Sequence, residues 1–160
     1  MISHCFRVSV VVLFSLLLGA CSSDNSGRYV ETESSAAQKL YLSDNAQRQG
    51  VQTTASGLQY EVLKAGSGAK PVATNTVTVH YVGTLIDGSE FDSSYSRNAP
   101  ATFPLGNTIQ GWVEGVQLMN VGSQYRFVIP SELAYGERGA GQNIRAGDTL
   151  IFSIELLSIE

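Results

Sequence analysis

Residues 80–95 read HYVGTLIDGSEFDSSY and contain a strong signal for a hairpin. The pair Asp87-Gly88 predicts a hairpin, because a tight turn with positive φ values suits these two residues. The turn joins a strand that carries Tyr81 to a strand that carries Phe91 and Asp92. Two aromatic side chains and a carboxylate therefore gather on one hairpin, while nothing beside them resembles a nucleophile, a general base or a metal-binding cluster.

The segments around this hairpin alternate between apolar and polar residues. Alternation with period two is typical of half-buried antiparallel strands. Pro130 ends one of these strands, because proline has no N–H to give to a ladder. The apolar positions predicted to share a face within each segment are Leu58, Tyr60 and Val62; Val77, Val79 and Tyr81; Tyr125, Phe127 and Ile129; and Leu150, Phe152, Ile154 and Leu156.

In two other segments the apolar residues recur at the spacing of a helix. Residues 36–49, AAQKLYLSDNAQRQ, predict a short helix that stops at Gly50. Residues 110–120, QGWVEGVQLMN, place Trp112, Val116 and Met119 on one helical face. One short amphipathic helix packed against a curved antiparallel sheet is an α+β arrangement, and this is the fold class that we predict.

Composition limits the possible classes of function. The chain has 160 residues, 43% hydrophobic and 15% charged, which suits one globular domain with a modest extension. Its formal net charge of -4 leaves no electrostatic footprint for nucleic acid. The only cysteines and histidines are Cys5, Cys21, His4 and His80. A disulfide framework and a His/Cys metal site are therefore excluded from the folded body, and no cofactor is expected.

The amino terminus has the features of a secretory signal. Arg7 precedes an apolar run at 8–18 that is too short to span a bilayer permanently. The four residues LGAC at 18–21 resemble the bacterial lipobox, which implies cleavage before Cys21 and a lipid anchor on its thiol; the alternative is an ordinary signal peptide. Ser22 stands where an Asp would signal retention in the inner membrane, so we expect an envelope lipoprotein at the outer membrane, facing the periplasm.

The chain thus divides into four predicted parts. Residues 1–20 form the signal peptide, and residues 21–35, rich in Ser, Asp, Asn and Glu, form a flexible tether because they cannot bury enough apolar surface to offset ordering entropy. Residues 36–50 form the short helix. Residues 51–160 form the folded body.

The candidate site residues also have structural interpretations. Phe91 and Asp92 are consecutive in a strand, so their side chains leave opposite faces unless a bulge re-aims one of them. Tyr81 and Trp112 could be ordinary core aromatics, or the wall and floor of a pocket. Tyr135 begins a glycine-rich loop whose backbone can approach another chain closely.

Three stretches taken together identify a family. They are VHYVGTLIDGSEFDSSYSRNAP at 79–100, FPLGNTIQGWVEGVQLMNVGSQYRFVIPSELAYG at 103–136 and NIRAGDTLIFSIELLSI at 143–159. In order and spacing they resemble the FKBP family of peptidyl-prolyl cis-trans isomerases, from about Gly57 to Glu160. Residues 41–68 are similar to the junction into the isomerase domain of lipoproteins related to macrophage infectivity potentiator.

The resemblance implies a half-barrel sheet wrapped around the short helix, and a pocket for prolyl peptides. It implies proline-containing unfolded or partly folded envelope proteins as substrates, and macrolides of the rapamycin type as ligands. Those lipoproteins dimerise through a longer helical domain, and with one helix here we expect a monomer. The implied catalytic residues are Tyr81, Phe91, Asp92, Trp112, Tyr135 and Phe152; the implied substrate-binding residues are Phe103, Thr108, Ile109 and Ile144; and Arg97 is implied to pair with Asp92.

Two positions depart from the family pattern. Ala101 stands two positions before Phe103, where many members have an aromatic residue, and Thr108 stands where Val is frequent. Both differences indicate a more open wall, which bears on macrolide binding. Two other classes of function compete with an isomerase: an FKBP-like binding module or holdase with little turnover, and a structural lipoprotein that needs no pocket.

Overall fold

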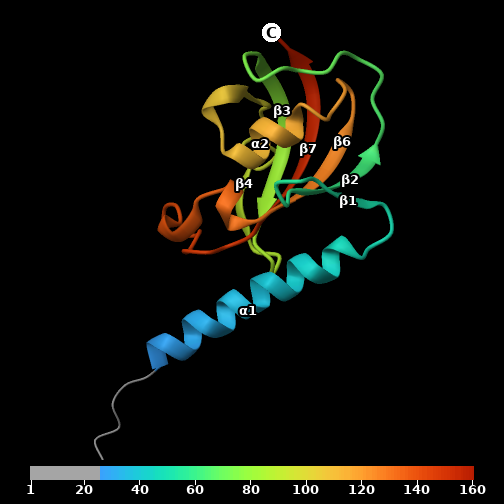
Figure 1. Ribbon diagram of the computed structural model, residues 1–160. Helices are drawn as coiled ribbons and strands as arrows, with labels where there is room; N and C mark the ends of the chain where they lie inside the picture. Colours follow the sequence, from blue (N-terminus) through green and yellow to red (C-terminus); the bar gives the residue numbers. More distant parts are fainter. Residues whose placement is uncertain (1–25) are drawn as a thin grey trace, which may run out of the picture.

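The computed structural model describes residues 26–160, with side chains from Ser34 onward. The predicted signal peptide and Cys21, the predicted site of lipidation, lie outside this range. An open antiparallel sheet curves around the short helix α2 (Gln110–Val116), and the longer helix α1 (Ser26–Ala46) lies at one end of the sheet (Figure 1). This arrangement confirms the predicted α+β fold.

Seven strands form one sheet in the order β1-β2-β6-β7-β3-β4, with β5 paired to β3 outside this path. Every pairing is antiparallel. β1 and β5 are short strands that the sequence pattern did not predict. The strands are β1 (Val51–Thr53), β2 (Gln59–Lys64), β3 (Thr76–Thr84), β4 (Glu90–Ser93), β5 (Ala101–Pro104), β6 (Gln124–Ile129) and β7 (Leu150–Ile159).

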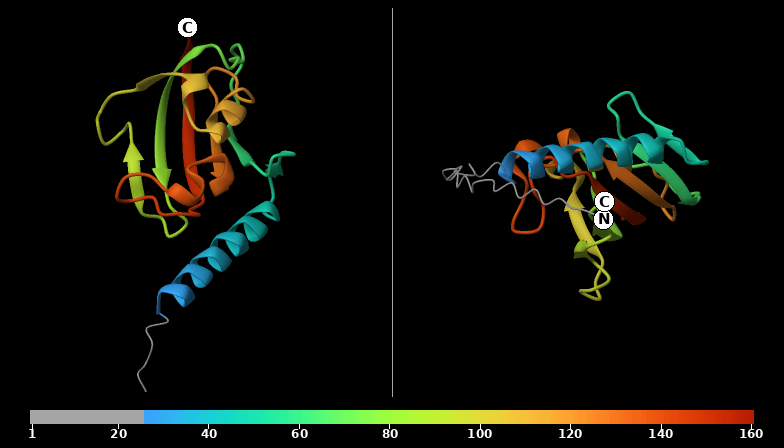
Figure 2. Two further views of the ribbon diagram at one scale, coloured as in Figure 1. Left: turned by 60° about the vertical axis from the view of Figure 1, so that its left-hand side comes forward. Right: turned by 90° about the horizontal axis from the view of Figure 1, so that it is seen from below.

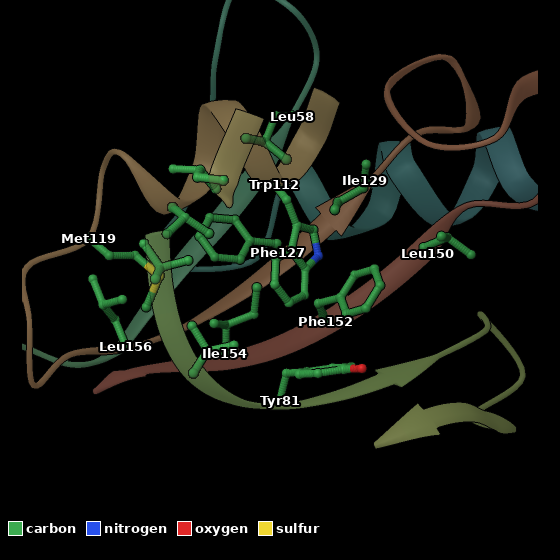
Figure 3. Packing of buried hydrophobic residues seen from close by; sticks show 14 residues of the cluster. Leu58, Tyr81, Trp112, Met119, Phe127, Ile129, Leu150, Phe152, Ile154 and Leu156 are labelled. Atoms are coloured by element: carbon green, nitrogen blue, oxygen red, sulfur yellow. The ribbon is translucent and has the colours of Figure 1, made fainter. Parts of the chain in front are cut away.

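The core lies between the concave face of the sheet and α2. Along β3 and β7 buried and less buried residues alternate strictly over eight positions, which confirms the period-two pattern. Figure 3 shows the indole of Trp112, from α2, between Phe127 of β6 and Phe152 of β7, above the ring of Tyr81. The helix therefore fills the curve of the sheet with its one tryptophan.

Two glycines let α2 approach the sheet closely. A Cβ atom on Gly111 would lie 2.4 Å from Ile129 Cγ2, and one on Gly115 would lie 2.7 Å from Phe127 Cε1. Both distances are shorter than carbon atoms tolerate, so these positions set the helix-to-sheet spacing.

We expect Gly115→Ala to destabilise the protein by about 1–2 kcal/mol. Alanine favours a helix over glycine by about 1 kcal/mol, but overpacking a tight core costs about 1–3 kcal/mol. Urea unfolding monitored by circular dichroism measures the difference. A more stable variant, as helix propensity alone predicts, would contradict the close packing of α2.

The helix α1 differs from its prediction at both ends. It begins at Ser26, ten residues before the predicted start, and it ends at Ala46, before Gly50 with its φ of +88°. Residues 26–35 are therefore helical, and the predicted tether is wrong for this part. α1 extends past the end of the sheet (Figure 2). No helix within residues 26–160 combines the length and the apolar character needed to cross a bilayer.

Two residues of β2 differ from their predicted environments, and α1 explains one of them. Val62 is 40% exposed, although the alternation placed it with the buried Leu58. Gln59, which the pattern placed on the polar face, is only 5% exposed, because α1 covers it. Its side chain donates to the carbonyl of Leu42 at 2.9 Å and accepts from Asn45 at 2.7 Å. The helix thus packs on the folded body through buried polar contacts.

Candidate functional site

The β3–β4 hairpin has the turn that Asp87-Gly88 predicted, with one difference. Gly88 has a φ of +87°, whereas Asp87 keeps a negative φ, so the expectation of positive angles at both residues is wrong. Gly88 N–H donates to the Leu85 carbonyl at 3.0 Å, and Leu85 N–H donates to the Ser89 carbonyl at 2.9 Å. A loop longer than two residues needs the left-handed conformation only at its glycine.

A β-bulge in β4 brings Phe91 and Asp92 to the same site. Gly83 pairs with Asp92 and Thr84 pairs with Glu90, which leaves Phe91 without a partner in the ladder. The bulge re-aims one side chain, as the sequence required if both residues were to act together. Phe91 and Asp92 accordingly line one cavity.

This cavity has a volume of about 750 Å³ and opens on the concave side of the sheet, beside α2. Its volume lies in the usual range for small-molecule and peptide sites. All ten residues predicted to be catalytic or substrate-binding line it, and six further residues were not predicted. The lining residues are Tyr81, Phe91, Asp92, Phe103, Thr108, Ile109, Trp112, Tyr135, Ile144 and Phe152, together with Asn107, Ala134, Ala140, Gly141, Gln142 and Asn143.

Aromatic rings in edge-to-face contact build the wall of the cavity. The Trp112 ring lies 5.3 Å from Tyr81, 5.3 Å from Phe152 and 5.7 Å from Phe103, between ring centroids, with interplanar angles of 85–90°. Phe91 meets Phe152 in the same way at 5.5 Å. Such pairs are each favourable by about 0.5–1.5 kcal/mol beyond the buried area. Trp112 is 5% exposed and forms the floor.

The polar groups at the mouth form one hydrogen-bonded cluster. The Tyr81 hydroxyl donates to one carboxylate oxygen of Asp92, and the Arg97 guanidinium pairs with the other. Arg97 Nη2 also donates to the Tyr81 hydroxyl at 2.9 Å, and its guanidinium lies 5.6 Å from the centre of the Tyr81 ring, within range of a cation–π contact. Arg97 thus holds Asp92 as predicted, from outside the cavity lining.

These contacts shift two pKa values apart. Burial, together with the hydrogen bond to Asp92, raises the pKa of Tyr81 above its ordinary value. Burial alone would raise the pKa of Asp92, but the hydrogen bonds from Tyr81 and Arg97 outweigh it and hold that pKa below its ordinary value. At neutral pH the site therefore presents a neutral tyrosine and an ionised aspartate.

The comparisons with known proteins agree with this geometry. The family described as FKBP-type peptidyl-prolyl cis-trans isomerase matches residues 67–157, and the domain amino terminal to such isomerases matches residues 24–62. The chain belongs to the FKBP family. The amino-terminal match includes all of α1, so this helix corresponds to part of the domain that precedes the isomerase domain in the family.

Two curated relatives and one solved structure give the extent of the likeness. An FKBP-type isomerase named FkpA, from Aeromonas hydrophila, is 61% identical over 75% of this chain and 44% of its own length. Outer membrane protein MIP from Legionella longbeachae is 46% identical over 80% of this chain and 55% of its own length. The crystal structure of FkpA from Escherichia coli superposes with a TM-score of 0.79 at 41% identity, over 84% of this chain and 63% of that one. The chain spans about half the length of the curated relatives.

Gly83 is a site residue of this FKBP that sequence reasoning missed. A Cβ atom there would lie 2.6 Å from Phe91 Cζ and 2.9 Å from Phe152 Cε1. The absence of a side chain lets the Phe91 ring cross the strand and reach Phe152. An isolated glycine within an alternating strand is a known signal for a bulge or a close approach, and the stretch YVGT carried it.

The loop after β6 completes the mouth of the FKBP cavity. Tyr135 is 42% exposed at its start. Ala140 and Ile144 exchange backbone hydrogen bonds at 2.8 and 3.1 Å, which folds the loop back on itself. Gly139, with a φ of +63°, lies so close that a Cβ atom would be 2.3 Å from the Ile144 carbonyl oxygen. This close approach helps to place Ile144 in the cavity.

We expect Arg97→Met to raise the pKa of Asp92. The variant removes a cation and a donor that favour the ionised carboxylate, whereas Arg97→Lys retains the charge and serves as control. Because the wild-type pKa is lowered, contacts that need the charge persist to low pH and are lost as the pH falls through it. In the methionine variant this loss begins at higher pH. A carbon NMR titration of Asp92 measures the shift, and an unchanged midpoint would contradict the role of Arg97.

Proposed function

We propose that this protein is a peptidyl-prolyl cis-trans isomerase that accelerates rotation about Xaa-Pro bonds in unfolded or partly folded envelope proteins. One observation carries the proposal: an aromatic cavity with Trp112 as its floor has Asp92 and Tyr81 hydrogen-bonded at its mouth. Prolyl isomerisation suits such a site because no covalent bond is broken, and neither a nucleophile nor a cofactor is required.

The chemical problem is one of speed. Delocalisation of the nitrogen lone pair makes rotation about a peptide bond cost about 18–20 kcal/mol. For a prolyl bond the two isomers differ by only about 0.5–1 kcal/mol, yet they exchange over about tens to hundreds of seconds. A protein that binds the twisted amide more tightly than either planar form lowers this barrier. Each tenfold acceleration requires the activation free energy to fall by about 1.4 kcal/mol.

Each part of the site has a role in this differential binding. The rings of Trp112, Phe91 and Phe152 receive the proline ring and keep water from the amide carbonyl, which disfavours the polar planar amide relative to the less polar twisted state. The Asp92 carboxylate and the exposed Tyr135 hydroxyl orient the backbone on either side of the rotating bond. Arg97 keeps Asp92 ionised and in place.

We infer that the protein acts in the cell envelope, held at the outer membrane by a lipid on Cys21 and facing the periplasm. The lipobox-like sequence supports this location, as does similarity to a protein named as an outer membrane protein. Several acyl chains together give stable anchoring, because each buried methylene contributes about 0.8 kcal/mol.

Membrane fractionation tests the anchor. We expect wild type to sediment with the outer membrane and Cys21→Ala to move into the soluble periplasmic fraction. A wild-type protein found in the soluble fraction would contradict lipid anchoring. The monomeric state remains a prediction, which light scattering of the purified protein tests.

A proline-peptide assay separates the isomerase from its main alternative. We expect the full chain to accelerate cis-to-trans conversion of an Ala-Phe-Pro peptide, and rapamycin to inhibit it by occupying the same cavity. Thr108 lines that cavity, so inhibition also tests whether the open wall weakens macrolide binding. A protein that suppresses aggregation of an unfolded client without accelerating the peptide would be a holdase, and the proposed activity would be wrong.

A further inference from the structure

One glutamine of α1 joins the helix to the segment that closes the cavity loop. Gln38 Nε2 donates to Asp148 Oδ1 at 3.1 Å, and the backbone N–H of Thr149 donates to Gln38 Oε1 at 3.0 Å. The three residues are buried, with exposed fractions of 9%, 7% and 1% in the order given by their numbers. More than 100 residues of chain separate the two partners of each bond.

The contact continues from Asp148 into the cavity wall. The other carboxylate oxygen of Asp148 accepts the backbone N–H of Arg145 at 2.7 Å, and Gly147 N–H donates to the Gly136 carbonyl at 3.0 Å. Arg145 directly follows Ile144, which lines the cavity. Gln38 therefore fixes Asp148, and Asp148 fixes the base of the loop that carries Ile144. Figure 1 shows this orange to red-orange loop next to α1.

We propose that Gln38 is a positioning residue of the site: it holds the loop 135–148 in the conformation that presents Ile144 and Tyr135 to the substrate. The inference rests on the proposed isomerase function. On this inference α1 affects substrate binding through the loop, although no described residue of the helix lines the proline cavity.

The chemistry of the amide explains why a glutamine suits this position. Its N–H₂ group donates to a carboxylate while its oxygen accepts a backbone N–H, and a buried pair of this kind needs both functions at once. A glutamate would offer only acceptors to Asp148 and would place two carboxylates together. An alanine would leave a buried oxygen of Asp148 and the Thr149 N–H without these partners.

The other polar contacts of α1 provide matched controls. The Tyr41 hydroxyl accepts from Arg126 of β6 at 2.7 Å, and Asn45 donates to Gln59 of β2 at 2.7 Å. Both contacts attach the same helix to the sheet without touching the loop. Tyr41→Phe therefore weakens the attachment of α1 while it leaves the Gln38 contacts in place.

The test compares Gln38→Ala, Gln38→Glu and Tyr41→Phe in the full chain. For the Ala-Phe-Pro peptide we expect both Gln38 variants to raise KM about fivefold and to change kcat by less than about twofold. Amide hydrogen exchange at Arg145 and Thr149 is expected to accelerate at least about tenfold, while exchange at Val79 in the core stays unchanged. Tyr41→Phe is expected to lower the thermal midpoint and to leave both KM and loop exchange at wild-type values.

Two results would overturn the inference: Gln38 variants with wild-type KM and wild-type loop exchange, or Tyr41→Phe with the same changes as Gln38→Ala. The second result would mean that the site depends on the general attachment of α1 to the sheet and not on the specific contacts of Gln38. If wild type shows no isomerase activity, the proposed function fails; the exchange rates still decide whether Gln38 holds the loop, so the two failures can be distinguished.

Discussion

We expect Asp92→Leu to lower kcat/KM for an Ala-Phe-Pro peptide by about tenfold to a hundredfold, which corresponds to about 1.4–2.7 kcal/mol of transition-state stabilisation. Leucine has nearly the same size but cannot accept the hydrogen bonds of Tyr81 and Arg97. The Tyr81 hydroxyl then loses its acceptor, and the cavity loses the one carboxylate among the described residues that line it. We expect the variant to fold, because the Arg97 side chain is half exposed and can be hydrated once its partner is removed.

Two further variants make this result specific. Phe91→Ala removes the ring next to Phe152 and is expected to lower kcat/KM by a similar factor, chiefly through weaker binding of the proline ring. Glu90→Gln changes an exposed carboxylate on the same strand, outside the proline cavity, and is expected to leave the rate within about twofold of wild type. Unchanged catalysis in both Asp92→Leu and Phe91→Ala would reject the assigned site.

Gly83→Ala is expected to reduce both stability and catalysis, although it adds only one methyl group. The new Cβ atom would overlap the rings of Phe91 and Phe152, at 2.6 and 2.9 Å. Overpacking costs about 1–3 kcal/mol, and the Phe91 ring must leave its place in the cavity wall. We expect kcat/KM to fall at least about tenfold, measured with the same peptide, and the urea midpoint to fall as well.

A double variant distinguishes this clash from a general defect in β3. Gly83→Ala combined with Phe91→Leu removes the nearer of the two rings that the new methyl group would meet, and leaves only the ring of Phe152. We expect the pair to be more stable than the sum of the single effects predicts, since neighbouring residues that share a contact are not additive. Catalysis should stay low, because the aromatic wall is absent. Simple additivity of the two changes would show that Gly83 and Phe91 do not compete for this space.

The main elements of the fold could be predicted because each has a strong local pattern. Alternation along β3 and β7 and the Asp87-Gly88 turn are properties of neighbouring residues, and the structure confirms them. The site residues followed from the family resemblance rather than from any one motif. Alone, Tyr81 or Trp112 could have been an ordinary core residue, and only their assembly into one cavity favours a site.

The errors arose where distant contacts or cooperativity decide the outcome. Gln59 of β2 is buried against its predicted environment because it is hydrogen-bonded to α1, and no local pattern in β2 contains that information. The helix begins at Ser26 because extending an existing helix fixes one residue for each new hydrogen bond, whereas only nucleation is costly. Apolar burial alone therefore predicts a start for this helix that is too late in the chain.

The part of the cavity formed by residues 140–143 was also beyond prediction. These residues reach the site through a folded-back loop, held by the Ala140–Ile144 pair and closed at its base near Gly136 and Gly147. Glycine-rich loops have few local constraints, so their path depends on the contacts they make. The sequence did not predict the bulge at Phe91. It indicated only that Phe91 and Asp92 could share a site if their strand contained a bulge.

We propose that the water-poor aromatic cavity binds the proline ring of the substrate. NMR measurement of intermolecular contacts between an Ala-Phe-Pro peptide and the full chain tests this claim directly. We predict nuclear Overhauser effects from the proline ring protons to the indole of Trp112 and the ring of Phe152, all of which disappear when rapamycin is added. Contacts to another surface, with none to Trp112 or Phe152, would contradict the account.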